Sequence, residues 1–339
     1  MQASDTDPSR EADGPAEPGG LASRVYLMIP THTTRHLEPC LGTLVHQRIP
    51  PSAVSLTCDN DQADIADLAL RVYTNYWCRT WPDPASRPRL LLTQRPHQGV
   101  ALLNQVRNNG IRTLLRDAGA DDRDLIVVLD GDTMLAPDAI ARHGALRHDG
   151  FELVIPYRVN LTEQRTALLN TAELLEPEGE RVLGTLAEDD QLASLAKRQR
   201  RYERQLWLKR NAPAWLRLVK RHKPKIIGGH HAVSVRLLRA VNGFDERYEA
   251  YGANDDELAL RLHMLDEQLR IAIAVREIPA FHLWHPTRAE RPPTESPGYE
   301  LFKNTPDRSR AAMGLDTPRA QQAPTVREAT ERGWAKLDP

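Results

Sequence analysis

Two acidic clusters about 125 residues apart could carry out chemistry together. Asp130-Gly131-Asp132 follows the apolar run 125–129, and Asn254-Asp255-Asp256-Glu257 opens an amphipathic segment. Two carboxylates separated by a glycine can present oxygens to a divalent cation, because glycine lets the backbone approach a ligand closely. A Mg²⁺ or Mn²⁺ ion held there would stabilise the charge that grows on a diphosphate leaving group. A carboxylate of the second cluster could take a proton from a hydroxyl.

Each cluster also has a purely structural interpretation. The chain has four Asp-x-Asp triplets, which begin at Asp5, Asp59, Asp122 and Asp130. Only the triplets at Asp59 and Asp130 follow predicted strands, so both are candidates for the metal site, and either could simply be a turn that ends a strand. The cluster at 254–257 could serve only as a helix N-cap with acids that suit the helix dipole.

Composition limits the class of protein. The 339 residues are 40% hydrophobic and 27% charged, which suits one large domain or two small ones. The formal net charge of −1 gives no overall attraction to nucleic acid or anionic lipid. Cys40, Cys58 and Cys78 match no zinc or redox spacing, and no apolar run approaches the roughly 20 residues of a membrane span. With no apolar leader at the N-terminus, we expect a cytoplasmic protein, peripheral at the membrane at most.

Alternating apolar segments predict the fold. The strands are expected over 25–29, 53–57, 90–93, 125–129 and 153–156, and the helices between them over 35–47, 64–76, 100–115 and 137–146. This alternation predicts an α/β fold with a mostly parallel sheet and helices on both faces. Ligands bind outside the carboxyl ends of such strands, where Thr31-His32-Thr33, Asp59-Asn60-Asp61 and Asp130-Gly131-Asp132 fall. A further helix is expected over 255–265 and a strand over 271–275.

A basic segment interrupts the alternation. Residues 162–225 are predicted to be helical, and Lys197 to Lys225 contain twelve Lys/Arg and a single acid, Glu203. The segment could be a solvated helix face, or it could dock an acidic acceptor, a diphosphate or an anionic membrane. Trp207 and Trp215 lie about two helical turns apart, so they could share one face, which would be buried or membrane-facing. No nucleic-acid-binding module surrounds the segment, so no nucleic-acid partner is expected.

The order of the motifs over residues 24–286 resembles the family 2 glycosyltransferases of the GT-A fold, including those with a galactosyltransferase-like C-terminal half. Val25 to Thr33 resembles the first strand and its turn, and Tyr251 to Leu258 resembles the catalytic motif that is usually written Trp-Gly-x-Glu-Asp-(Asp)-x-Leu. Tyr251 stands in place of the usual Trp, and Asn254 in place of the usual Glu, which puts the identity of the acceptor in doubt.

The resemblance implies a role for each site residue. Asp255 would be the base, Asp132 and Asp130 would bind the metal, and His285, or else His282, would be a further metal ligand. The donor-binding residues would be Pro30, Thr31, His32, Asp59, Arg107, Asn108, Asp130, Gly131 and Asp132. The acceptor side would comprise Gly228, Gly229, Tyr251, Asn254 and Asp256.

The implied activity is inverting transfer of a sugar from a nucleoside diphosphate sugar, with UDP favoured, to an unidentified hydroxyl acceptor. The expected organisation is a disordered tail (1–23), a donor half (24–160), a helical basic insertion (161–227), a catalytic half (228–286) and an extended or disordered tail (287–339). One alternative is a sugar nucleotidyltransferase, which needs a Gly-rich phosphate loop where this chain has Pro30-Thr31-His32-Thr33. The other is a non-catalytic module that binds a membrane or nucleic acid through 197–225.

Overall fold

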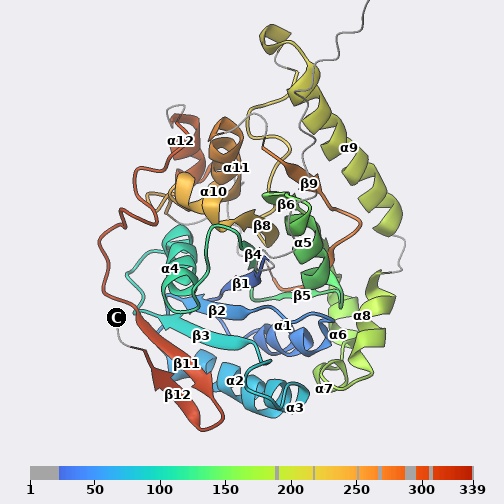
Figure 1. Cartoon of the computed structure of the whole chain (residues 1–339), viewed down its shortest axis with the longest axis vertical. Coiled ribbons are helices and arrows are strands. Elements are labelled where there is room, and N and C mark those ends of the chain that lie inside the picture. The colour runs from blue at the N-terminus through green and yellow to red at the C-terminus, as the bar shows by residue number, and fades with distance from the viewer. Residues whose placement is uncertain are drawn as a thin grey trace, which may run out of the picture.

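Nine strands form the central sheet (Figure 1). The computed structural model describes residues 23–187, 191–216, 218–249, 252–265, 269–286, 295–304 and 308–337. In order across the sheet, its strands are β12 (Gly333–Lys336), β11 (Thr325–Thr330), β3 (Arg89–Gln94), β2 (Ala53–Cys58), β1 (Val25–Pro30), β4 (Leu125–Leu129), β8 (His230–Ser234), β6 (Leu153–Ile155) and β9 (Ile271–Ile273). β8 and β11 run opposite to the other seven. The predicted α/β fold with a mostly parallel sheet is confirmed.

Helices cover both faces of this sheet because its strands bury side chains on both sides. In β1, Tyr26 and Met28 join one core, which includes Ile111 of α4, while Leu27 joins the other, which includes Leu41 of α1. The helices are α1 (Leu37–Gly42), α2 (Ala63–Val72), α3 (Cys78–Thr80), α4 (Leu103–Arg116), α5 (Ala139–His148), α6 (Glu163–Leu168), α7 (Thr171–Leu174), α8 (Gly179–Ala187), α9 (Gln191–Asn211), α10 (Val235–Ala240), α11 (Asn254–Leu265) and α12 (Pro297–Asn304).

A second, three-stranded sheet lies beside the carboxyl end of β4. It consists of β5 (Thr133–Leu135), β10 (Pro279–His282) and β7 (Tyr157–Asn160), with β10 in the middle. β10 is antiparallel to β5 and parallel to β7. Because β5 follows β4 after three residues, this sheet brings two distant segments of the chain next to Asp130 and Asp132.

The C-terminal region corrects one prediction. We expected an extended or disordered tail over 287–339, but it contains α12 and the β11–β12 hairpin, and β11 pairs with β3 from Thr325↔Gln94 to Glu328↔Leu91. The hairpin therefore closes one edge of the central sheet, at the opposite end from β9. Of the predicted N-terminal tail, residues 1–22 lie outside the described part of the chain.

The segment 161–227 contains α6 to α9, as its helical prediction requires, but one detail was wrong. Trp207 and Trp215 do not share a helix, because α9 ends at Asn211 and Trp215 lies in a short 3-10 helix, η3 (Ala214–Leu216). Pro213 comes between the two elements, and proline cannot donate to a helical hydrogen bond. Both indoles are nevertheless exposed, by 62% and 81%.

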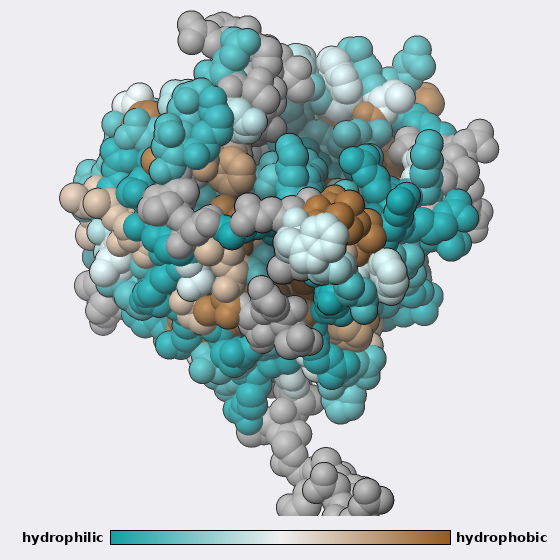
Figure 2. Space-filling model, turned by 90° about the horizontal axis from the view of Figure 1, so that it is seen from above, coloured by the Kyte–Doolittle hydropathy of each residue, from teal (hydrophilic) through white to brown (hydrophobic). Residues whose placement is uncertain are grey.

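The surface is mostly hydrophilic in the view from above (Figure 2). Within the described ranges, every helix is too short or too polar to cross a bilayer. The three cysteines form no disulfide, and Cys40 and Cys58 are buried as packing residues.

Candidate active site

One carboxylate and two imidazoles meet where β4 leads into β5. Nε2 of His285 lies 3.1 Å and Nε2 of His282 lies 3.4 Å from Oδ2 of Asp132. The potential ligand atoms of all three residues lie within 4.8 Å of one another. Burial disfavours the charged form of Asp132, but the hydrogen bond from His282 and the positive groups nearby hold its pKa below the ordinary value. The structure thus brings together three of the four predicted metal ligands.

The small sheet creates this arrangement. Residue pairing between β5 and β10 sets His282 opposite Thr133, which directly follows Asp132. The backbone N–H of Leu283 donates to the carbonyl oxygen of Asp132 at 3.0 Å. Nε2 of His36 lies 2.9 Å from the carbonyl oxygen of Trp284 and so links the start of α1 to the segment between the two histidines.

Asp130 has different partners. Nη1 of Arg158 donates to its Oδ2 at 2.9 Å, and Nη2 of Arg107 lies 3.9 Å from its Oδ1. Desolvation raises the pKa of Asp130; the two guanidinium groups oppose this rise, while Asp132 and Asp255 add to it. Asp130 is not part of the cluster of potential metal ligands found in the described residues, so its role as an assisting metal ligand stays a prediction.

The second carboxylate of the site belongs to the first turn of α11. Nη1 of Arg107 donates to Oδ1 of Asp255 at 2.9 Å, and Nη2 donates to the carbonyl oxygen of Gly228 at 3.2 Å. The Arg107 side chain is only 2% exposed, and its guanidinium lies 5.0 Å from the centre of the Phe244 ring. Because the same guanidinium reaches Asp130, the two predicted acidic clusters meet at one arginine.

Two glycines occupy the space between these carboxylates. A Cβ at Gly228 would lie 2.2 Å from Oδ2 of Asp255, and a Cβ at Gly229 would lie 2.7 Å from Oδ2 of Asp130 and 2.2 Å from Nη1 of Arg158. Antiparallel pairing of β8 with β4 continues to this point, where the N–H of Asp130 donates to the carbonyl oxygen of Gly229 at 3.2 Å. Any side chain at either position would displace a charged group of the site.

The three acids in the first turn of α11 point in different directions around the helix axis. Asp255 faces Arg107, whereas Oδ1 of Asp256 lies 3.6 Å from Nζ of Lys223. Glu257 is buried and forms two hydrogen bonds, of 2.6 and 2.7 Å, with Arg261. The cluster therefore combines one acid paired with Arg107, one acid near Lys223 and one buried ion pair with Arg261.

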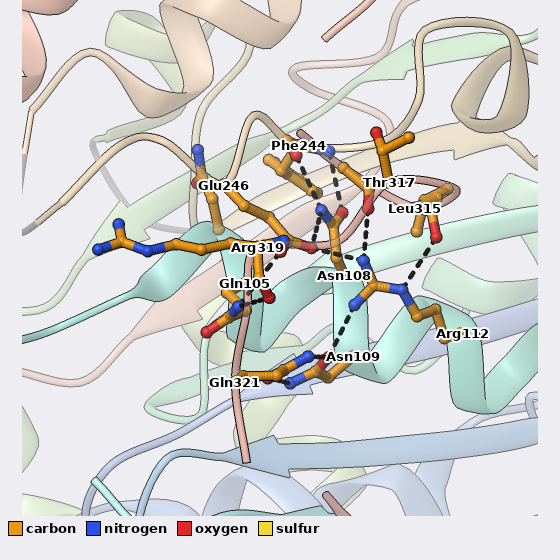
Figure 3. Close-up of polar contacts among 12 residues, drawn as sticks. Gln105, Asn108, Asn109, Arg112, Phe244, Glu246, Leu315, Thr317, Arg319 and Gln321 are labelled. Atoms are coloured by element: carbon orange, nitrogen blue, oxygen red, sulfur yellow. Dashed lines mark hydrogen bonds and ion pairs between the residues drawn. The ribbon is translucent and has the colours of Figure 1, made fainter. Parts of the chain in front are cut away.

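The side chain of Asn108 is fully used by the protein itself, whereas that of Asn254 is used only in part, because its Oδ1 has no partner among the described residues. Asn108 is fully buried; its Nδ2 donates to the carbonyl oxygen of Phe244 and to Oε1 of Glu246, and its Oδ1 accepts from the Phe244 N–H (Figure 3). Nδ2 of Asn254, a 5% exposed residue, donates to Oδ1 of Asn104 at 3.1 Å. Asn108 thus links α4 to the segment around Phe244, and Asn254 links α11 to α4. Tyr251, also predicted to contact the acceptor, lies outside the described residues.

The same face of α4 holds a larger polar network (Figure 3). Arg112 donates to Oε1 of the buried Glu246 at 2.6 Å, and Gln105 donates to Oε2 of Glu246 at 3.3 Å. The N–H of Arg319 donates to Oε2 of Glu246 at 2.8 Å, and Asn109 exchanges hydrogen bonds with Gln321. The C-terminal segment thus fixes α4, and with it Arg107.

Four of the predicted donor residues, Pro30, Thr31, His32 and Asp59, lie at the carboxyl ends of β1 and β2. Asp59 is 8% exposed, and its Oδ2 lies 3.9 Å from Nε2 of His97. The Thr31 hydroxyl donates to the carbonyl oxygen of Thr33, Pro30 is buried, and His32 is exposed.

Gly131 allows the first and fourth strands to end close together. A Cβ there would lie 3.0 Å from Cβ and Oγ1 of Thr31, and the Gly131 N–H points to the carbonyl oxygen of Pro30 at 3.3 Å. The residues predicted to bind the nucleotide and those predicted to bind the metal therefore meet along a single edge of the sheet.

Two arginines of the site were missed by sequence reasoning. Arg95 directly follows β3; its side chain is buried, and its Nε and Nη2 have no hydrogen-bond partner among the described residues. Burial lowers the pKa of Arg95, and Asp59 partly offsets this effect. The position of Arg95 just after a predicted strand could have identified it as a candidate site residue. Arg158 belongs to no motif and reaches Asp130 only through the pairing of β7 with β10.

Residues 217–284 match the family model described as the N-terminal domain of galactosyltransferase. This segment contains Gly228, Gly229, Asp255 and His282, and it ends before His285. The segment is thus similar to that domain of galactosyltransferases. The predicted resemblance to glycosyltransferases is confirmed for it. No curated protein matches the chain in sequence.

Solved structures give distant matches. S. aureus TarS 1–349 in complex with UDP-GlcNAc is 11% identical, with a TM-score of 0.46 over 83% of this chain and 65% of that one. Against another TarS structure the match covers 78% of this chain and only 37% of that one, with a TM-score of 0.45. Glucosyl-3-phosphoglycerate synthase from Mycobacterium tuberculosis, in complex with Mn²⁺, UDP-glucose and phosphoglyceric acid, is 11% identical, with a TM-score of 0.37 over 81% of this chain and 79% of that one. These TM-scores are too low to support any conclusion about the site.

Proposed function

We propose that this chain is a metal-dependent, inverting glycosyltransferase that moves a sugar from a nucleoside diphosphate sugar to an acceptor hydroxyl. One observation supports it above all: Arg107 contacts both Asp130 and Asp255, so that a candidate base and a candidate diphosphate site lie on either side of one guanidinium. UDP is the favoured nucleotide because members of the family that the motifs resemble commonly use it.

The donor set of Asp132, His282 and His285 fits a divalent cation, since one carboxylate and two imidazoles converge on a common point. Two imidazole ligands favour Mn²⁺ over Mg²⁺, which prefers oxygen ligands. A cation held there would offset charge on the diphosphate as the bond to the sugar breaks.

Asp255 is proposed as the general base. Its Oδ1 is held by Arg107, so its carboxylate is oriented before the acceptor arrives. The acceptor hydroxyl gives its proton to Asp255 and attacks the anomeric carbon, while the bond from that carbon to the diphosphate oxygen breaks. A single displacement without a protein nucleophile inverts the anomeric configuration. Arg158 and Arg107 lie beside Asp130, where their guanidinium N–H groups could also donate to oxygens of the departing diphosphate.

The remaining assignments belong to the same proposal. Residues 24–160 form the donor half, 161–227 an insertion and 228–286 the acceptor half. Gly228, Gly229 and Asp256 border the acceptor, and Asp59 contacts the nucleotide base. The protein works in the cytoplasm and needs no nucleic acid.

The test combines ligand binding with turnover. A thermal-shift panel of UDP, GDP, TDP and CDP, each with Mn²⁺ or with EDTA, identifies the nucleotide, because a ligand of the folded state raises its stability. Asp255→Asn should keep the Mn²⁺-dependent shift and lose at least about a hundredfold in donor turnover. Asp122→Asn, at an exposed acid that pairs with Arg239 and has no role in the proposal, is the control. Equal turnover in the Asp255→Asn variant and the unmodified protein would remove Asp255 from its role.

A further inference from the structure

A large apolar cleft lies away from the candidate active site, at the open edge of the central sheet. It has a volume of about 630 Å³ and is bounded by α5, α9 and β9. That volume is within the range of small-molecule sites, roughly 300–1,000 Å³. The side chains that line it include Leu146, Phe151, Leu206, Trp207, Ile271 and Ile273. It shares no residue with the site of Asp130, Asp132 and Asp255.

α9 is fixed over this edge at two points. Nε2 of Gln199 donates to the carbonyl oxygen of Ile273 at 2.9 Å, and Nη2 of Arg210 donates to the carbonyl oxygen of Leu269 at 2.6 Å. The cleft lies between these two attachments, beside an edge strand. The helix therefore forms one wall of a cleft that exists before any ligand arrives.

The outer face of α9 is strongly basic. Seven Lys/Arg stand against one acid in the helix, a net charge of +6. Lys197, Arg200, Arg201 and Arg204 are exposed, and their spacing of three and four residues places them on one face. Trp207 follows Arg204 by three residues, so it lies at the border between this face and the cleft.

Large apolar side chains continue the surface beyond the helix. Trp207 is 62% exposed although it lines the cleft, and Trp215, Leu216 and Leu218 are 81%, 41% and 55% exposed. Exposed indoles next to lysine and arginine are typical of surfaces that lie at the boundary of a bilayer.

We propose that α9 and η3 dock this protein on an anionic phospholipid bilayer, with one acyl chain entering the cleft beside Trp207. The basic face would meet the head groups, and Trp215, Leu216 and Leu218 would enter the interface. A second copy of the chain fits less well, because a two-fold contact through this surface would bring together two α9 helices, each of net charge +6. Anionic lipid complements that charge.

The first experiment measures co-sedimentation with vesicles of phosphatidylcholine, with and without phosphatidylglycerol, at low and at physiological salt. The unmodified protein should bind only the anionic vesicles, and more weakly as salt rises. The double variant Arg200→Glu/Arg204→Glu should lose at least about tenfold in affinity. Arg332→Glu/Lys336→Glu makes the same charge change on the exposed β12 hairpin, at the opposite edge of the sheet, and should bind like the unmodified protein.

The second experiment tests the cleft in a Trp215→Phe background. Phosphatidylglycerol brominated on its acyl chains should quench tryptophan fluorescence, and Trp207→Phe should remove that quenching while Trp334→Phe in the hairpin should not. Equal binding to both vesicle types, equal loss in the two double variants, or quenching that survives Trp207→Phe would overturn the proposal. So would a dimer, seen by light scattering, that persists at low protein concentration and excludes vesicles. If a variant unfolds at a lower temperature than the unmodified protein, the proposal is judged on how vesicle binding by the unmodified protein depends on anionic lipid and on salt.

Discussion

Two pairs of histidines have almost the same internal geometry and opposite surroundings. The rings of His282 and His285 lie 5.2 Å apart at 65°, and those of His143 and His230 lie 5.5 Å apart at 75°. The first pair is partly exposed and faces Asp132, whereas the second is fully buried, with Nε2 atoms 3.3 Å apart and no partner for either Nδ1 in the described residues. A nearby carboxylate and access to water, more than the imidazoles themselves, make the first pair suited to a cation.

The largest effect should come from removing the carboxylate that distinguishes the two pairs. Asp132→Ala should weaken Mn²⁺-dependent binding of the nucleotide by at least about a hundredfold, because it removes a direct ligand of the proposed ion. Isothermal calorimetry with UDP and Mn²⁺ measures this loss. Asp122→Ala, an exposed acid paired with Arg239, is the control and should change nothing. Unchanged binding in Asp132→Ala would refute the metal assignment.

Removal of one histidine from each pair sharpens the contrast. His285→Ala or His282→Ala should each weaken Mn²⁺ binding by about 10- to 100-fold, and the loss should be smaller with Mg²⁺, which depends less on imidazole. His143→Phe, in the buried pair, should leave Mn²⁺ binding unchanged. A similar loss of Mn²⁺ binding in His143→Phe would show that the two pairs are not functionally distinct.

The buried pair should instead govern stability in acid. Burial lowers the pKa of His143 to about 3, and burial together with the neighbouring His143 holds the pKa of His230 well below its usual value. In the unfolded chain these two histidines bind protons near pH 6.5, whereas in the folded chain they stay neutral at that pH. Stability should therefore be complete above about pH 6.5 and fall by about 1.4 kcal/mol per pH unit and histidine below it. Urea unfolding between pH 7 and pH 5 measures the slope, which His143→Phe should reduce; an equal slope in that variant would contradict this account.

The smallest effect is expected for Arg158, one of the two arginines that the sequence analysis missed. Arg158 is partly exposed, and Asp130 keeps Arg107 as a second partner, so Arg158→Met should cost stability only about 1 kcal/mol. Its effect on donor binding should be larger than its effect on stability if the guanidinium faces the diphosphate. Arg116→Met, which breaks an exposed ion pair with Asp117, is the control for stability alone.

The sequence predicted most of the sheet because the strands that end at the site are continuous apolar runs. β4 and β1 are buried on both faces, and such runs can be read without knowledge of their partners. The β11–β12 hairpin was missed because it is polar; only Val326 and Ala329 of β11 are buried. The strands of the small sheet, β5, β7 and β10, have three or four residues each, too few for periodicity to show.

Within the candidate site, residue type and position after a strand identified the charged groups that lie together in the structure. Asp132 lies at the end of a strand, and the structure brings it to His282 and His285, as the motif order had suggested. Asn108 was assigned to the donor, but its side chain bonds the protein's own backbone, which spacing along a helix does not reveal. The assignment of Asn254 to the acceptor stays a prediction, since its Oδ1 has no partner among the described residues. Arg158 could not be found, since its contact depends on the pairing of three short strands.

The hairpin that closes the sheet at β3 has a practical consequence. β3 contains the run Leu90-Leu91-Leu92, and β11 alone occupies its outer hydrogen-bonding groups. A chain cut before Thr325 would leave that row of amides and carbonyls bare, ready to recruit a strand from another molecule. Shortened versions made for crystallisation should therefore precipitate or polymerise, even though every residue of the candidate catalytic apparatus would still be present.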